Sequence, residues 1–194
     1  MKKVIISILL AILSLSAFSQ TSLGTWDANT ATYTNNIHKI SWTLPKDYNW
    51  VNDKATNASI SFKAVSEDIG CMLTINIHTD RKYGDDIWPN YAYYNSKEYF
   101  DGANKAMSAV GVELKSVEWV KSQICGIHAL KSTSIIEREE RPLGKIDILG
   151  IVYEFYFEGK SYSISLQVPK LIYDANDDYG FVINQLIKGI KINR

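Results

Sequence analysis

The three histidines are the first residues to consider for chemistry. His38, His78 and His128 each fall in a predicted β-strand. None has a further His, Cys or carboxylate at the spacing of a zinc motif such as H-E-x-x-H or C-x-x-C. His78 and Asp80 come nearest to a pair, because alternate residues of a strand share a face. A lone strand histidine is usually an ordinary hydrogen-bonded residue, so a hydrolase that uses His78 or His128 is the weakest of our functional hypotheses.

Other chemical motifs are incomplete. Residues 174–178 begin like a calcium loop of the form D-x-N-x-D. Tyr179, however, stands where the turn needs glycine, and Gln185 stands where a bidentate carboxylate is needed. Acidic residues at the start of a helix explain the same segment without a metal. The chain also has neither a G-x-S-x-G nucleophile motif nor a Gly-rich phosphate loop. We therefore predict no catalytic residue, no metal and no cofactor.

The best candidate for a binding site is the aromatic segment 81–94. Aromatic side chains with polar tips suit protein interfaces and the flat faces of sugar rings or peptides. An irregular segment of this length is uncommon in a compact domain unless it is functional or disordered. The competing interpretation is that several of the rings fold back and cover one end of a sheet. The predicted binding residues are Arg81, Tyr83, Asp85, Asp86, Trp88, Tyr91, Tyr93 and Tyr94.

The N-terminus has the pattern of a secretory signal peptide. Lys2 and Lys3 precede an apolar run, residues 4–13, and a cleavage-type segment ends at Ser19. We expect residues 1–19 to be removed, with cleavage between Ser19 and Gln20, and the chain to be exported to the periplasm or the exterior. No Cys stands directly after the cleavage site, so we expect a soluble chain without a lipid anchor. No later apolar run approaches the length that a membrane-spanning helix needs.

Composition limits the possible partners. Removing Lys2 and Lys3 from the 21 basic residues leaves 19 against 21 acidic ones, a formal charge of −2. A nucleic-acid binder would usually show a basic excess, so we predict no nucleic-acid partner. With 46% apolar and 22% charged residues, the chain is expected to fold rather than stay disordered.

Cys71 and Cys125 are the only cysteines. In an oxidising compartment they are candidates for a disulfide, which would stabilise the fold by about 4 kcal/mol in the chain-entropy model. The alternative is two buried thiols that pack as small hydrophobic groups.

Hydrophobic periodicity predicts one α+β domain over residues 37–194, preceded by a flexible arm over residues 20–36. Alternating apolar residues indicate about six antiparallel strands, and Ser161–Val168 is the clearest, with one buried and one solvent-facing side. Two main helices are expected. The first follows a capping-box pattern at Asn95 and Glu98, and the second carries an apolar stripe from Tyr179 to Ile187. The expected strands are 38–44, 60–64, 71–78, 112–121, 124–136, 146–157 and 161–168.

This order of elements resembles the PsbP/DcrB-like superfamily of exported proteins. The segments that carry the resemblance are "ISWTLPKDYNW", "SKEYFDGANKAMSAVGVE", "CGIHALKSTSI", "YEFYFEGKSYSISLQVP" and "FVINQLIKGIKI". They extend over about Ile37 to Asn193, as patterns of residue classes rather than diagnostic motifs. The resemblance implies a non-catalytic binding or assembly domain, and it points to no particular partner and no shared catalytic residue.

Three hypotheses for function follow. The first is an exported domain that binds another protein or envelope component. The second is a module for a small ligand or glycan that uses the rings of segment 81–94 as a platform. The third is the hydrolase with a strand histidine.

Overall fold

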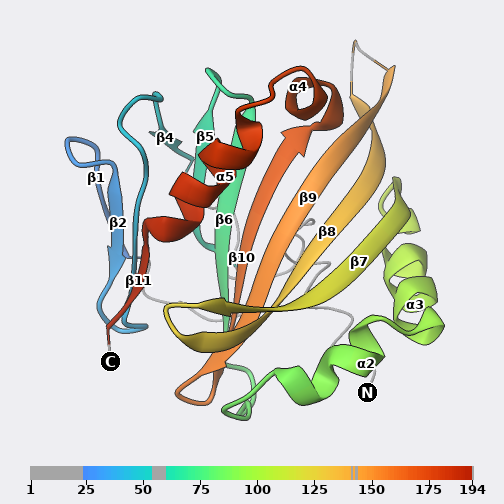
Figure 1. Ribbon diagram of the computed structural model, residues 1–194, viewed down its shortest axis with the longest axis horizontal. Coiled ribbons are helices and arrows are strands. Elements are labelled where there is room, and N and C mark those ends of the chain that lie inside the picture. The colour runs from blue at the N-terminus through green and yellow to red at the C-terminus, as the bar shows by residue number, and fades with distance from the viewer. Residues whose placement is uncertain (1–23, 54–59, 141, 143, 194) are drawn as a thin grey trace.

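The computed structural model describes residues 24–53, 60–140, 142 and 144–193. The predicted signal peptide and its cleavage site at Ser19 and Gln20 lie outside these residues. The described part folds into two antiparallel sheets with helices packed against them (Figure 1). A sheet of seven strands has the order β4-β5-β6-β10-β9-β8-β7, and a sheet of four strands has the order β1-β2-β3-β11.

The mixed, mostly antiparallel architecture confirms the predicted fold class, but the expected number of about six strands is wrong. Among the four α-helices of the described residues, α3 and α5 are the main helices that the sequence predicts, and α2 and α4 are single turns. The strands are β1 Thr25–Asp27, β2 Thr32–Asn35, β3 Ile40–Thr43, β4 Val51–Asn52, β5 Ile60–Ser66, β6 Cys71–His78, β7 Val112–Ile124, β8 Ile127–Glu140, β9 Gly144–Phe157, β10 Lys160–Pro169 and β11 Ile190–Ile192. The helices are η1 Trp88–Asn90, α2 Tyr91–Tyr94, α3 Lys97–Ser108, α4 Lys170–Asp174 and α5 Tyr179–Lys188.

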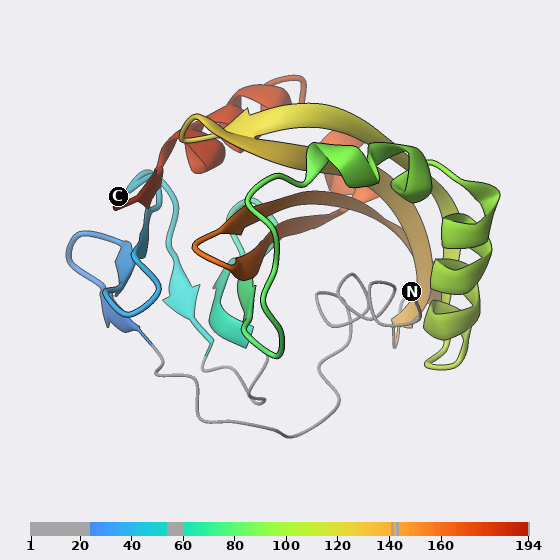
Figure 2. The same ribbon diagram turned by 90° about the horizontal axis from the view of Figure 1, so that it is seen from below.

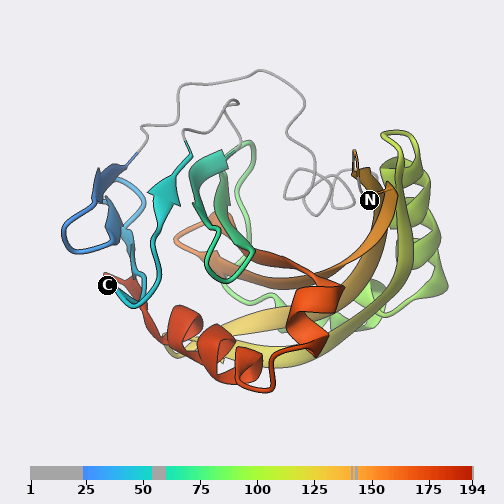
Figure 3. The same ribbon diagram turned by 90° about the horizontal axis from the view of Figure 1, so that it is seen from above.

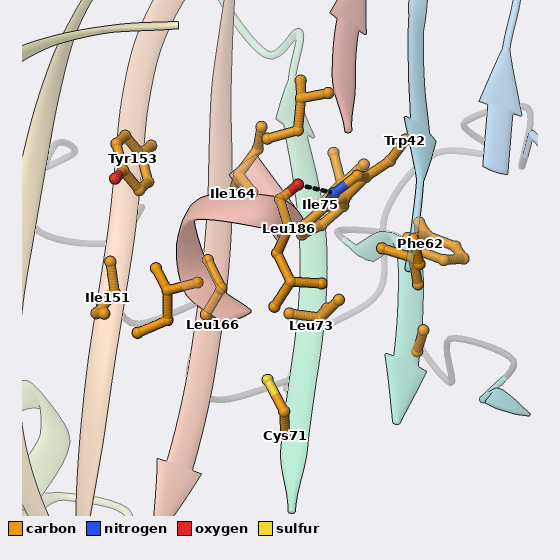
Figure 4. Close-up of a cluster of buried hydrophobic side chains, with 14 of the residues drawn as sticks. Trp42, Phe62, Cys71, Leu73, Ile75, Ile151, Tyr153, Ile164, Leu166 and Leu186 are labelled. Carbon is orange, nitrogen blue, oxygen red and sulfur yellow. Dashed lines mark hydrogen bonds between the residues drawn. The ribbon is translucent and has the colours of Figure 1, made fainter. Parts of the chain in front are cut away.

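The large sheet is strongly curved (Figures 2 and 3) and carries a separate hydrophobic core on each face. Helix α5 and the small sheet pack on one face, over β6 and β10 (Figure 1). Helices α2 and α3 pack on the other face, over β7 and β8. Neighbouring residues of β8 show the division, because Ala129 lies in the first core and Leu130 in the second. The core between α5, the small sheet and the large sheet is drawn in Figure 4.

Two tight hairpins set the register of the large sheet. Glu158 and Gly159 join β9 to β10 with φ values of 49° and 71°. Cys125 and Gly126 join β7 to β8 in the same way, with φ values of 51° and 74°. Positive φ at both central residues matches the right-handed twist of the flanking strands. The first hairpin confirms the sequence prediction.

The expected flexible arm over residues 20–36 is wrong for the part that the structure describes. From Gly24 onward this segment forms β1 and β2, and β2 pairs with β3. The Tyr33 ring stacks on Phe62 at 4.4 Å between centroids, and the Tyr33 hydroxyl donates to the Ser61 carbonyl at 3.1 Å. The small sheet thus begins before residue 37, and its position depends on contacts with the large sheet.

The expectation that one side of β10 faces solvent is also wrong. Ser161, Ser163, Ser165 and Gln167 are as buried as the apolar residues between them. On β6, Thr74 and Asn76 are buried on this same side. Central strands of a sheet can be covered on both faces, so alternation in the sequence reveals the apolar side without showing that the polar side is exposed.

The possible disulfide is not formed. Cys71 is a buried thiol at the start of β6, whereas Cys125 lies in the β7–β8 turn, where its Sγ donates to the Ile190 carbonyl at 3.3 Å. The alternative of two buried thiols is also only half right, because Cys125 is exposed.

Helix α3 begins one residue later than its predicted capping box. Ser96, rather than Asn95, is the N-cap, and its Oγ accepts from the Tyr99 amide at 3.2 Å. Asn95 instead bonds both backbone groups of Trp119 on β7, at 3.0 and 3.2 Å, and so fixes the helix start against the sheet.

We expect Ser96→Ala to lower the free energy of unfolding by about 1 kcal/mol, because it removes a side-chain acceptor from the first turn. Urea denaturation monitored by circular dichroism measures this change. Ser108→Ala, at the exposed last turn of α3, is the matched control and should change stability by less than about 0.5 kcal/mol. Equal effects of the two substitutions would contradict the assignment of Ser96 as the cap.

Candidate functional site

The structure divides the predicted binding segment 81–94 into an inner and an outer part. Tyr83, Ile87 and Tyr94 are buried in the core beneath α2 and α3. Tyr94 packs edge-on against Trp119 at 4.6 Å between centroids. The interpretation that rings fold back over the sheet therefore holds for two of the five predicted aromatic residues. Trp88, Tyr91 and Tyr93 are half-buried against the same core.

Contacts of its ring, its ring nitrogen and its backbone amide fix the position of Trp88. Its ring lies parallel to that of His128, with 3.5 Å between centroids and 5° between planes. Its Nε1 donates to the Ala129 carbonyl at 3.0 Å, and its backbone amide donates to Asp86 Oδ1 at 2.9 Å. The same Asp86 oxygen lies 3.2 Å from His128 Nδ1. These contacts fix the orientation of a partly exposed tryptophan.

Lys121 of β7 completes this surface. Its Nζ lies 5.2 Å from the Trp88 ring centroid and 5.5 Å from that of Tyr91, within the range of cation–π attraction. We call Asp86, Trp88, Tyr91, Lys121 and His128 the loop surface. Lys121 and His128 were not among the predicted binding residues. The pairing of β7 with β8 is the signal that could have placed them together. His128 on β8 lies opposite Gln123 on β7, and Gln123 is two residues beyond Lys121.

The remaining predicted residues lie outside the loop surface. Arg81 and Asp85 are exposed beside a shallow pocket of about 520 Å³ that Glu158 and Lys160 also line. The guanidinium of Arg81 lies over the Tyr83 ring at 4.7 Å. Tyr93 packs edge-on against Tyr99 of α3. The structure therefore groups Asp86, Trp88 and Tyr91 on the loop surface. Asp85 lines a neighbouring pocket together with His128, and Tyr83 and Tyr94 lie in the core.

The histidines show one pairing of the kind that a hydrolase needs. Asp86 lies within reach of His128, but both side chains are about two-fifths or more exposed, at 46% and 40%. The partners of His128 among the described residues are Asp86 and Trp88, and neither is a nucleophile. His78 does not pair with Asp80, which accepts from the Tyr83 hydroxyl at 2.9 Å. Burial lowers the pKa of His78, and also that of His38.

Metal-ligand clusters and membrane-spanning helices are both absent from the described residues. No group of three or more His, Cys, Asp or Glu side chains gathers there as metal ligands would. In the calcium-like segment, Asp174 pairs with Lys170, and Asn176 Oδ1 accepts from the Asp178 amide at the start of α5. Within the same described part, no helix is long and apolar enough to cross a bilayer.

A second candidate site lies on the polar side of the central strands. Ser163 of β10 stands between Asn76 of β6 and Glu154 of β9 in one cross-strand row. In the next row Ser165 stands beside Thr74. We call these five residues the polar strip. All of them are at most 2% exposed. The strip lies on the same side of the sheet as Leu130, and hence as α2 and α3, because Leu130 is the cross-strand partner of Glu154.

Several atoms of the polar strip have no hydrogen-bond partner among the described residues. They are Thr74 Oγ1, both polar atoms of the Asn76 amide, Ser163 Oγ and Glu154 Oε1. The other carboxyl oxygen of Glu154, Oε2, accepts from the Tyr94 hydroxyl at 2.6 Å. Burial raises the pKa of Glu154 to about 7, although the bond from Tyr94 opposes this shift. Buried polar groups are nearly always hydrogen-bonded, so five such atoms in adjacent register positions require an explanation.

Sequence reasoning missed the polar strip because Ser and Thr alternating with apolar residues on a strand usually mark a solvent-facing side. The one available signal was Glu154, the only charged residue in the run from Gly150 to Phe157. Asp, Glu, Lys and Arg are rarely buried without a partner.

Comparison with known proteins identifies the class of fold. The chain is similar to the solution structure of cyanobacterial PsbP (CyanoP) from Synechocystis sp. PCC 6803, with a TM-score of 0.51, 12% identity and coverage of 93% of this chain and 99% of the other. The fold is therefore PsbP-like, as the resemblance implied. At this identity the likeness concerns the fold alone.

Two further solved structures are more distant. A crystal structure from Bacteroides thetaiotaomicron VPI-5482 has a TM-score of 0.47 and 13% identity, and covers 84% of this chain but 48% of its own. The Saccharomyces cerevisiae Ran-binding protein Mog1p has a TM-score of 0.45 and 9% identity, with coverage of 86% and 96%. No protein-family model and no curated protein sequence matches the chain.

Proposed function

We propose that this chain is an exported, non-catalytic binding or assembly domain that docks a protein partner through the loop surface. The observation that carries the proposal is the fixed, partly exposed Trp88, stacked on His128 and bonded at both its ring nitrogen and its amide. Tryptophan dominates binding energy at many protein interfaces. A side chain that is already ordered loses little conformational entropy on binding.

The chemistry of the loop surface favours a protein over a glycan. A sugar ring stacks on an open aromatic face, whereas His128 already covers a face of Trp88 and the Lys121 ammonium lies over the same ring. Asp86 supplies a negative charge and Lys121 a positive charge beside Trp88 and His128. The rims of protein interfaces are polar in the same way. The Asp86–His128 pair is assigned a positioning role for Trp88 rather than a catalytic one, because no nucleophile accompanies it among the described contacts.

We expect Trp88→Ala to weaken capture of the native partner by about tenfold or more, because a central tryptophan anchor is lost. Affinity-tagged chain is incubated with envelope extract, and captured proteins are quantified by mass spectrometry against the tag alone. Any protein that qualifies as the partner is then purified and titrated against both forms of the chain.

Phe181→Ala is the matched control, because Phe181 is an aromatic residue of α5 that is 63% exposed and lies on the other side of the large sheet. It should leave capture unchanged. Equal binding by wild type and the Trp88→Ala and Tyr91→Ala variants would show that the loop surface is not the docking site.

A further inference from the structure

Strand β7 is the longest free sheet edge among the described strands. It is the last strand of the seven-stranded sheet and runs for 13 residues, whereas β4 at the opposite edge has 2 (Figure 2). An edge strand leaves a row of backbone N–H and C=O groups without strand partners, and proteins usually cover or shorten such a row. The part of β7 that stays open therefore shows where another chain can pair.

Two asparagines bond part of this edge. Asn104 Oδ1 of α3 accepts from the Leu114 amide at 3.1 Å. Asn95 bonds both backbone groups of Trp119, because its Nδ2 donates to the carbonyl at 3.0 Å and its Oδ1 accepts from the amide at 3.2 Å. The backbone groups of Trp119 therefore point away from β8, and a side chain satisfies them in place of a further strand.

The edge opens immediately beyond Trp119. In an antiparallel pair, residues that bond the neighbouring strand alternate with residues whose N–H and C=O groups point outward. The register of β7 with β8 is regular from Ser116 to Ile124, so Lys121 and Gln123 point outward as Trp119 does. No described residue bonds the backbone of Lys121 or Gln123 on that side. Unlike the polar strip, this stretch faces solvent, because both residues are exposed.

The open stretch is short. It runs from Lys121 to Ile124, about 13 Å at the rise of a β-strand. Asn95 closes one end, and the β7–β8 turn closes the other, where Cys125 Sγ donates to the Ile190 carbonyl of β11 at 3.3 Å. A flexible segment of about four residues fits between these limits. The β7 edge of a second copy fits less well, because α2 and α3 flank it.

The side chains beside the open stretch define what the added segment must carry. Lys121 lies on the side of α2, and its ammonium forms no ion pair among the described residues, since Asp86 pairs with His128 instead. On the other side of the sheet, Val120 is 42% exposed. Alternate residues of an added strand point to the two sides. A segment that alternates acidic and apolar residues therefore complements both Lys121 and Val120.

A lysine on an edge strand can also serve to prevent pairing, because its charge is unfavourable against another strand. Lys121 is arranged differently. Its Nζ lies over the rings of Trp88 in η1 and Tyr91 in α2, so the side chain turns over the face of the sheet rather than across the edge. The outward backbone groups of β7 are left uncovered.

We propose that the partner docked at the loop surface adds an extended segment to the open edge of β7, with backbone hydrogen bonds to Lys121 and Gln123 and an acidic side chain against the Lys121 ammonium. The segment is antiparallel to β7, as the other described strand pairs of this sheet are. A peptide that joins a sheet edge gains affinity from its main chain and specificity from alternate side chains. This inference rests on the proposed docking function, because it names the form in which the partner binds.

The probe is a short capped peptide in which glutamate and valine alternate. We expect it to shift the backbone amide resonances of Lys121 and Gln123 in heteronuclear NMR spectra and to slow their hydrogen exchange. Two control peptides should bind about tenfold more weakly. One has lysine in place of glutamate, and the other has N-methyl groups on the glutamate nitrogens, which face β7 because directly opposite residues share a side of the sheet. Equal binding by all three peptides, or no shift of either amide with the first, would overturn the proposal.

Substitutions at Gln123 separate backbone pairing from side-chain contact. Gln123→Pro removes the outward N–H and leaves the hydrogen bonds to β8 in place, and edge strands accept proline at such positions. It should weaken binding of the glutamate–valine peptide by about tenfold, whereas Gln123→Ala keeps the N–H and should bind as wild type does. Equal affinity of these two variants would refute the assignment.

Lys121→Glu tests the charge of the segment and does not depend on the folding of the proline variant. It should reverse the preference, so that the lysine–valine peptide binds more tightly than the glutamate–valine peptide. An unchanged preference would contradict the pairing of an acidic side chain with Lys121.

Capture of the purified partner separates this inference from the docking function. Weaker capture by Trp88→Ala but not by Gln123→Pro would keep docking at the loop surface and overturn strand addition. Undiminished capture by Trp88→Ala, with peptide binding at Lys121 and Gln123 as expected, would overturn the loop surface and keep the open edge as a peptide site. Sedimentation velocity of the chain alone tests for a second copy. A dimer that Gln123→Pro dissociates would show that the chain pairs with itself there, and would overturn the assignment to a partner.

Discussion

Trp42→Ala is expected to lower the free energy of unfolding by about 3–5 kcal/mol, a large part of the stability of a typical domain. Trp42 of β3 is fully buried between the small sheet, α5 and the large sheet (Figure 4). Its ring packs edge-on against Phe62 of β5, with 6.3 Å between centroids. Its Nε1 donates to the Leu186 carbonyl of α5 at 2.7 Å. One side chain therefore connects three elements that are distant in sequence.

The loss should come mainly from the cavity rather than from the hydrogen bond. The Leu186 carbonyl also accepts from the Gly189 amide at 3.2 Å, so removing the indole does not leave this acceptor without a partner. Trp42→Phe keeps an aromatic ring and loses the bond, and we expect it to cost about 1–2 kcal/mol. Urea unfolding followed by circular dichroism measures both variants. A loss below about 1 kcal/mol for Trp42→Ala would mean that the small sheet is not packed as described.

The importance of Trp42 also shows what the sequence could predict. Its alternation with Ile40 and Leu44 correctly indicated a strand with a buried side. The stripes of α3 and α5 were equally informative, and Tyr99, Met107, Tyr179 and Leu186 are all buried as expected. Such patterns are reliable because burying apolar residues at helix or strand spacing is the main favourable term in folding.

The two N-terminal strands could not be predicted in this way. They are only three and four residues long and hold one aromatic residue each, Trp26 and Tyr33, which is too little to show an alternation. They form strands because β2 pairs with β3 and because Tyr33 stacks on Phe62 of the large sheet. Both contacts depend on the assembled tertiary structure, so local sequence does not encode them.

The candidate sites were predictable to different extents. The composition of segment 81–94 drew attention to Trp88, but the pattern does not tell which rings turn inward. That choice depends on where α2 meets β7, which places Tyr94 against Trp119. The polar strip was hidden for a different reason. A pattern of alternating residues does not show whether the polar side of a strand is covered.

Glu154 supplies the second large expected effect, a stability that falls as the pH rises. Its carboxyl is fully buried and has a pKa raised to about 7 by burial, against 4.5 when exposed. Below pH 4.5 both the folded and the unfolded chain hold this proton, so the group has no effect on stability. Between pH 4.5 and 7 the folded chain keeps a proton that the unfolded chain loses, and stability decreases with rising pH. Above pH 7 the full loss is present, about 3 kcal/mol for a difference of about 2.5 pKa units.

Glu154→Gln should remove this loss, because an amide of similar shape stays neutral at every pH. We expect wild type and variant to differ little near pH 4.5, and the variant to be more stable by about 3 kcal/mol at pH 8. Urea midpoints measured at several pH values test this, because the titration of all other groups cancels in the difference. Glu118→Gln, at an exposed position on β7, is the control and should show no such trend.

Tyr94→Phe provides an independent check on the cause. The Tyr94 hydroxyl donates to Glu154 Oε2 and holds the pKa of Glu154 below the value that burial alone would produce. Removing that hydroxyl should move the midpoint of the pH effect upward, whereas removing the carboxyl should abolish the effect. If Tyr94→Phe left the midpoint unchanged, the Tyr94–Glu154 hydrogen bond would not be the contact that stabilises the ionised form. A pH-independent difference between Glu154→Gln and wild type would instead show that Glu154 does not titrate in the folded chain between pH 4.5 and 8.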